Sequence, residues 1–179
     1  TPFLNLSESH QKESKKLLKD LGINIENEWF VTVHAREPGW AEKSFVKTEF
    51  FRNGNIEDYN LSIDHIINSG GKVVRVGDKS MSKVKEKDGF IDYAHSKFKT
   101  EKLDVILAAK SKFCIASSSG FFSVACMFDV PIILTNTSHS IVYYRLKKSD
   151  FYVPSILKDK KTNIFLLIKS FPLVIIQFN

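Results

Sequence analysis

The sequence KFCIASSSGFFSVACMFDVPIILTN, residues 112–136, decides the fold of this chain. Phe113–Ala116 is a short apolar run with the length and composition of a strand, and Val130–Leu134 is a second one. Between them, apolar residues at 121–128 recur at the spacing of a buried helix. Apolar strands separated by a helix are typical of a parallel sheet that is covered on both faces. The stretch therefore predicts a β-loop-α-β unit.

The loop of this unit consists of four small residues, Ser117, Ser118, Ser119 and Gly120. Such a turn at the start of a helix offers free backbone N–H groups and hydroxyls, which together favour a bound phosphate. The alternative is that the serines and the glycine only cap the helix and turn the chain. The loop alone leaves both interpretations open.

The rest of the chain continues the alternation of helices and strands. Ser7 predicts a helix that runs to about Leu21 and stops at Gly22, Asn55 with Asp58 predicts the start of another, and Thr100 that of a third. Strands are expected at Trp29–Val33, 72–76 and 90–94. In residues 41–54 the apolar side chains recur with no clear period. This order predicts an α/β fold with a mostly parallel sheet, helices on both faces and right-handed crossovers. We expect one domain over residues 1–154. It is followed by an apolar tail over 155–179, for which the sequence does not predict one structure.

Several polar groups follow predicted strands directly. His34 and Arg36 follow the strand at 29–33, Gly77 and Asp78 follow the strand at 72–76, and the serine loop follows the strand at 113–116. Because the carboxyl ends of parallel strands share one edge, these groups are expected to converge there. Arg52 and Asn53, in a loop before a helix, can reach the same edge.

Each charged candidate has a structural alternative. Arg36 can contact a phosphate through two N–H groups, or form a surface ion pair with Glu37 or another acid. His34 is either an acid/base or hydrogen-bonding group, or a histidine that orients the loop. Arg75, inside an apolar strand, needs a buried partner, for which Asp78 and Asp92 are the candidates.

Composition limits the class of protein. The formal net charge is +6, but the lysines are scattered and few aromatic residues lie between them, which favours a solvated surface over a nucleic-acid groove. Cys114 and Cys126 are expected to be small buried thiols in a reducing compartment. No P-loop, Gly-x-Gly-x-x-Gly turn, Gly-x-Ser-x-Gly elbow or metal-ligand spacing is present, which leaves metal-free phosphate binding without a cofactor.

The ordered motifs resemble a bacterial family of glycosyltransferases associated with cell-surface polysaccharide and lipopolysaccharide synthesis. The resemblance covers about residues 7–138 and rests on VHAREPGW, FRNGNIEDYNLSIDHIINSGGKVVRVGD, IDYAHS and the central stretch. More distantly, the turn with His34 and Arg36 and the strand-Ser-Ser-Gly-helix segment are similar to the donor-phosphate turns of fucosyl- and heptosyltransferases of the GT-B type. The resemblance implies a Rossmann-like three-layer sandwich that forms one half of a GT-B enzyme.

The implied function is metal-independent transfer of a sugar from a nucleotide sugar to a glycan or lipid-linked acceptor. Arg36 and the backbone of Ser118, Ser119 and Gly120 would stabilise the departing diphosphate. Activity would need a second GT-B domain, and the expected location is the cytoplasm or the inner face of the membrane. The rival interpretations are a non-catalytic nucleotide- or phosphate-binding module and a flavodoxin-like interaction domain.

Overall fold

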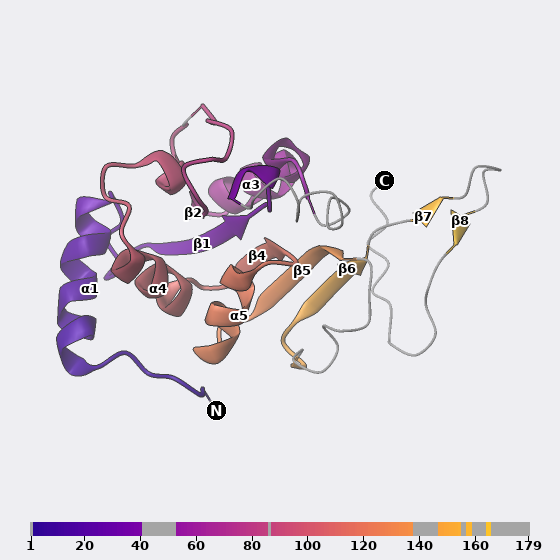
Figure 1. Ribbon diagram of the computed structural model, residues 1–179. Coiled ribbons are helices and arrows are strands. Elements are labelled where there is room, and N and C mark those ends of the chain that lie inside the picture. The colour runs from indigo at the N-terminus through magenta and orange to yellow at the C-terminus, as the bar shows by residue number, and fades with distance from the viewer. Residues whose placement is uncertain are drawn as a thin grey trace.

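The computed structural model describes residues 2–40, 53–85, 87–137, 147–154, 157–158 and 164–165. In this part of the chain, a parallel sheet of six strands has the order β3-β2-β1-β4-β5-β6 (Figure 1). Its strands are β1 (Trp29–His34), β2 (Gly71–Arg75), β3 (Phe90–Ile91), β4 (Cys114–Ser117), β5 (Ile132–Thr137) and β6 (Phe151–Pro154). The first strand therefore lies inside the sheet, with the next strands added outward on both sides. The predicted α/β class and parallel sheet are confirmed.

Helices cover both faces of the sheet. On one face lie α1 (Glu8–Asp20), α4 (Glu101–Lys110) and α5 (Gly120–Met127), and on the other α3 (Asn60–Asn68) with the preceding 3-10 turn η3 (Ile56–Tyr59) (Figure 1). Alternate residues of β1 supply the two cores, since Phe30 packs against α1 and α4 while Val31 and Val33 pack against α3. The result is the three-layer sandwich that the sequence predicts.

Capping residues start the helices where the sequence predicts, with one shift. The hydroxyls of Ser7 and Thr100 accept backbone N–H bonds at the starts of α1 and α4. Asn55 caps the 3-10 turn η3 through the amide of Glu57, so the α-helix itself begins only at Asn60. The predicted pairing of Asn55 with Asp58 is wrong, because the Asn55 side chain bonds two residues ahead.

The predicted strand at 90–94 is too long. After Ile91 the chain turns at Asp92 into a 3-10 turn, η4 (Tyr93–His95), because the Asp92 carboxylate is drawn to Arg75 and His95. Strand β6 was not predicted. It pairs with β5 alone at the edge of the sheet, and its four residues are too few to show an alternation of apolar and polar side chains.

Both cysteines are free thiols, which agrees with the predicted absence of a disulfide. Cys114 is fully buried, and burial raises the pKa of its thiol to about 12. Cys126 is half-buried in α5. Within the described residues, no helix is long and apolar enough to cross a membrane. In the predicted tail, β7 (Leu157–Lys158) and β8 (Ile164–Phe165) form a small antiparallel pair.

Candidate functional site

The carboxyl ends of β1 and β4 are joined by a direct hydrogen bond. His34 lies in register with Ala116, and the backbone N–H of Arg36 donates to the Ser117 hydroxyl at 2.8 Å. The same hydroxyl lies 3.4 Å from the backbone oxygen of His34, to which it donates. The turn after β1 and the serine turn therefore meet at one edge of the sheet, as the sequence predicts.

Arg36 is a buried residue of this edge, with 6% of its surface exposed. Its Nη1 donates to the Asn53 side-chain oxygen at 3.3 Å, and its backbone oxygen accepts from the Gly54 amide at 2.9 Å. Glu37, the acid named as an alternative partner of Arg36, binds Arg75 instead. A buried guanidinium held at the end of a parallel sheet is suited to binding an anion.

His34 packs against the first turn of α5. Its ring stacks on Phe121 with the centroids 6.0 Å apart and the planes 10° from parallel. Burial, with smaller contributions from the charges of Arg75 and Arg36, lowers the pKa of His34 to about 4. The imidazole is therefore uncharged at neutral pH, which fits a hydrogen-bonding or general-base role better than that of a general acid.

The start of α5 differs from the starts of α1 and α4. Ser119 is its N-cap residue, but the Ser119 side chain makes no capping hydrogen bond. Ser118 and Ser119 are half-buried, and Gly120 is exposed, with open space where a Cβ would lie. First-turn amides that the N-cap side chain leaves uncapped are suited to an anionic ligand.

Three buried polar atoms in the described part of the chain lack a hydrogen-bond partner at this edge. They are His34 Nδ1, Ser119 Oγ and Thr137 Oγ1, at the ends of β1, β4 and β5. Buried polar groups are normally satisfied, so a polar ligand bound at this edge would supply the missing partners.

The sequence analysis missed residues that complete this edge from β5 and η3. The Asn136 side chain donates to the Asn53 backbone oxygen at 2.7 Å, and the hydroxyls of Tyr59 and Thr135 lie 2.6 Å apart. Asn136 has a φ of 48°, a left-handed conformation that non-glycine residues seldom adopt. Its position directly after a predicted strand was the signal that could have revealed it.

Gly77 and Asp78 follow β2, which is parallel to β1, so they lie at the same edge of the sheet but in a turn of their own. The Asp78 carboxylate accepts from the Ser80 amide at 2.8 Å, and this bond lowers the pKa of Asp78. Gly77 has a φ of 155° and packs closely against Met81. Both residues therefore help to form the turn after β2. Arg52 lies outside the described residues.

Arg75 has its predicted ion pair with Asp92 and an additional one. Its guanidinium, fully buried, lies 3.2 Å from Asp92 and 2.6 Å from Glu37, and it donates to the Ser82 backbone oxygen at 2.7 Å. The predicted candidate Asp78 is not a partner. Because Glu37 directly follows Arg36, this buried cluster fixes the turn that carries Arg36.

The architecture is that of a Rossmann-like domain, with a parallel sheet between two layers of helices. The chain is similar to glycosyl transferase family 9 from Veillonella parvula, with a TM-score of 0.56 and 11% identity over 85% of this chain and 41% of that one. It is also similar to ADP-heptose lipopolysaccharide heptosyltransferase II of E. coli, with a TM-score of 0.55 and 12% identity over 89% of this chain and 46% of that one.

The chain thus spans less than half the length of these two enzymes, and at such low identity the likeness shows the fold. No protein-family model and no curated protein matches the chain. The predicted resemblance to heptosyltransferases is confirmed as a resemblance of fold.

Proposed function

We propose that this chain is the donor-binding half of a glycosyltransferase that moves a sugar from a nucleotide sugar to a glycan acceptor without a metal ion. The observation that carries the proposal is the bond from the Arg36 amide to Ser117, which joins a buried arginine to the end of β4, just before a helix whose N-cap residue, Ser119, makes no side-chain capping bond. One of the structurally similar proteins, heptosyltransferase II of E. coli, is named for ADP-heptose, a nucleotide sugar.

In this proposal, the acceptor hydroxyl attacks the sugar's anomeric carbon while the bond from that carbon to the diphosphate oxygen breaks, and the hydroxyl proton passes to solvent water. Negative charge then grows on the leaving diphosphate. Arg36 and the first-turn amides of α5 stabilise this charge, and they do so without rearranging, because Ser117 and Asn53 already hold the arginine. His34, which is neutral, contributes a hydrogen bond to the bound donor.

The acceptor, carried as a glycan or a lipid-linked glycan, is expected to approach from a second GT-B domain or from the membrane surface. Such a reaction would draw on nucleotide sugars in the cytoplasm or at the inner face of the membrane. The rival function is a non-catalytic module that binds a nucleotide or phosphate at the same edge. Sugar transfer or donor hydrolysis by the chain, alone or with a second domain added, distinguishes the enzyme from the module.

Calorimetric titration with ADP, GDP, UDP and CMP tests the binding step. We expect one of these nucleotides to bind, and we expect Arg36→Met to weaken it at least about tenfold, as loss of a charged hydrogen bond would. Arg36→Lys keeps the charge but loses the planar fork, and should recover only part of the affinity. Failure of all four nucleotides to bind, or full affinity in Arg36→Met, would overturn the proposal.

A further inference from the structure

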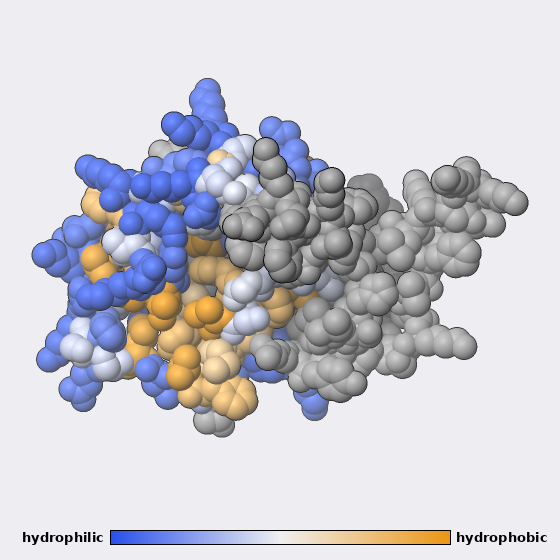
Figure 2. Space-filling view, viewed as in Figure 1, coloured by the Kyte–Doolittle hydropathy of each residue, from blue (hydrophilic) through white to orange (hydrophobic). Residues whose placement is uncertain are grey.

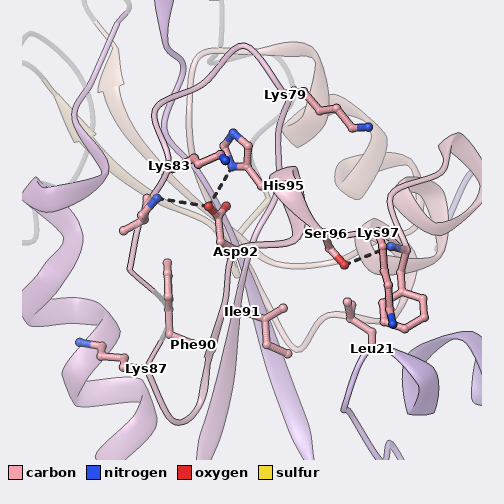
Figure 3. Close-up of a pocket in the computed structure, with 12 residues that line it drawn as sticks. Leu21, Lys79, Lys83, Lys87, Phe90, Ile91, Asp92, His95, Ser96 and Lys97 are labelled. Carbon is pink, nitrogen blue, oxygen red and sulfur yellow. Dashed lines mark hydrogen bonds and ion pairs between the residues drawn. The ribbon is translucent and has the colours of Figure 1, made fainter.

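A groove of about 940 Å³ is lined by residues of the edge strand β3 and of the segments before and after it (Figure 3). Its lining includes four lysines, Lys79, Lys83, Lys87 and Lys97, and the carboxylate of Asp92. Leu21 and Ile91 are apolar residues of the same lining. Three of the lysines come from the loop between β2 and β3, and Lys97 comes from the segment after η4. The sequence analysis treated these lysines as part of a solvated surface.

The positive charge of this groove is only partly compensated. Asp92 is already paired with the buried Arg75, and Lys87 is paired with Asp64 of α3. No residue in the described ranges forms an ion pair with Lys79, Lys83 or Lys97. The groove therefore presents three positive charges that an anion can neutralise.

His95 is fixed in the lining of the groove by a carboxylate. Its Nδ1 lies 2.9 Å from Asp92 Oδ2, and the same oxygen accepts from the Val84 amide at 3.3 Å (Figure 3). With the carboxylate as acceptor, the neutral imidazole carries its proton on Nδ1. Its Nε2 is then an acceptor, and no described residue donates to it. A hydroxyl-bearing ligand would supply the donor.

We propose that this groove binds an acidic saccharide. Lys79, Lys83 and Lys97 would bind its carboxylate or phosphate groups, and His95 Nε2 would accept a sugar hydroxyl. A nucleic acid fits less well because no aromatic face is free for stacking: Phe90 is buried, and the Lys97 ammonium lies 5.1 Å above the Phe98 ring. The choice of a saccharide rests on the proposed function, in which this ligand would be an acidic portion of the acceptor.

The test uses the whole chain and an oligogalacturonate, which carries carboxylates, with a phosphorylated oligosaccharide as a second ligand. A neutral oligosaccharide of the same length is the ligand control. We expect saturable binding of an acidic ligand that weakens about tenfold or more in Lys79→Gln/Lys83→Gln and several-fold in His95→Phe. Lys85→Gln, which removes an exposed lysine of the same loop that does not line the groove, should bind like the wild type.

Equal weakening in Lys85→Gln, or no saturable binding to either acidic ligand, would overturn the proposal. Single-stranded DNA that binds as tightly, with the same loss in the variants, would overturn it in favour of a nucleic-acid surface. Thermal unfolding of each variant checks that it is folded. Nucleotide titration of the groove variants separates the two sites. If nucleotide binding is unchanged and no acidic saccharide binds, the proposal for the groove is refuted and the proposal for the donor site stands.

Discussion

The amide of Arg36 and the hydroxyl of Ser117 are joined at 2.8 Å, although 81 positions separate them in the chain. This bond connects the two strands on which the proposed donor site depends. Ser117→Ala would leave the buried amide unsatisfied, so we expect the free energy of unfolding to fall by about 1–2 kcal/mol and nucleotide affinity to fall about fivefold. Ser123→Ala, in the body of α5, is the control. Unchanged affinity in Ser117→Ala would show that Arg36 needs no such support.

The depressed pKa of His34 predicts a dependence of stability on pH. The pKa is about 4 in the folded protein and 6.5 in the unfolded chain, so between these values the unfolded chain binds the extra proton. The free energy of unfolding is therefore complete above about pH 6.5 and falls as the pH drops towards 4. We expect a loss of about 2 kcal/mol between about pH 7.5 and pH 5.

Urea unfolding at these two pH values, for the wild type and His34→Gln, measures this loss. The variant should show a much smaller change, because it has no group at this position to protonate. His65→Gln, which replaces an exposed histidine of α3, should keep the wild-type dependence. A wild-type slope in His34→Gln would mean that another group causes the loss.

The ion pair between Glu37 and Arg75 should matter far more for stability than an ion pair on the surface. Arg75 is fully buried, so Glu37→Gln leaves its charge with Asp92 as the remaining anionic partner, and we expect a loss of about 2–4 kcal/mol. Glu26→Gln breaks the exposed pair with Lys15 and should cost about 0.5 kcal/mol or less. Equal values from urea unfolding would contradict the structural role assigned to Arg75.

Two glycines should respond differently to alanine. Gly120 is exposed, has an ordinary φ and has nothing within 4 Å of an added Cβ, so Gly120→Ala should leave the free energy of unfolding within about 0.5 kcal/mol. Its nucleotide affinity should fall about fivefold or more, since the methyl group would stand at the helix start. Gly77→Ala meets Met81 at a φ of 155°, and should cost about 2 kcal/mol or more. Equal destabilisation would make Gly120 a structural residue.

Much of the fold could be predicted because the apolar runs of β1, β2, β4 and β5 are short, dense and bounded by turn residues. The same rule, that polar groups after parallel strands share an edge, predicted the meeting of Arg36 with the serine turn. It also placed Gly77 and Asp78 there. The sequence does not show that the chain after β2 folds back on itself through Ser80 and Met81.

Partners that are distant in the chain were the least predictable. Asp92 was a candidate for Arg75 because a lone charge inside an apolar strand needs an acid nearby. Glu37 was considered only as an alternative partner of the adjacent Arg36, since the direction of the turn after β1 is set by tertiary contacts. The link from Asn53 to Asn136 depends in the same way on two loops that meet only in the folded chain.

The central place of β1 in the sheet has a consequence for synthesis on the ribosome. Its pairing with β2 can form soon after Arg75 has emerged, but its other edge is completed only when Cys114–Ser117 has been made. During that interval an apolar strand exposes unpaired backbone groups to other nascent chains. A slow ribosome between these two points would lengthen the period in which the chain is prone to aggregate.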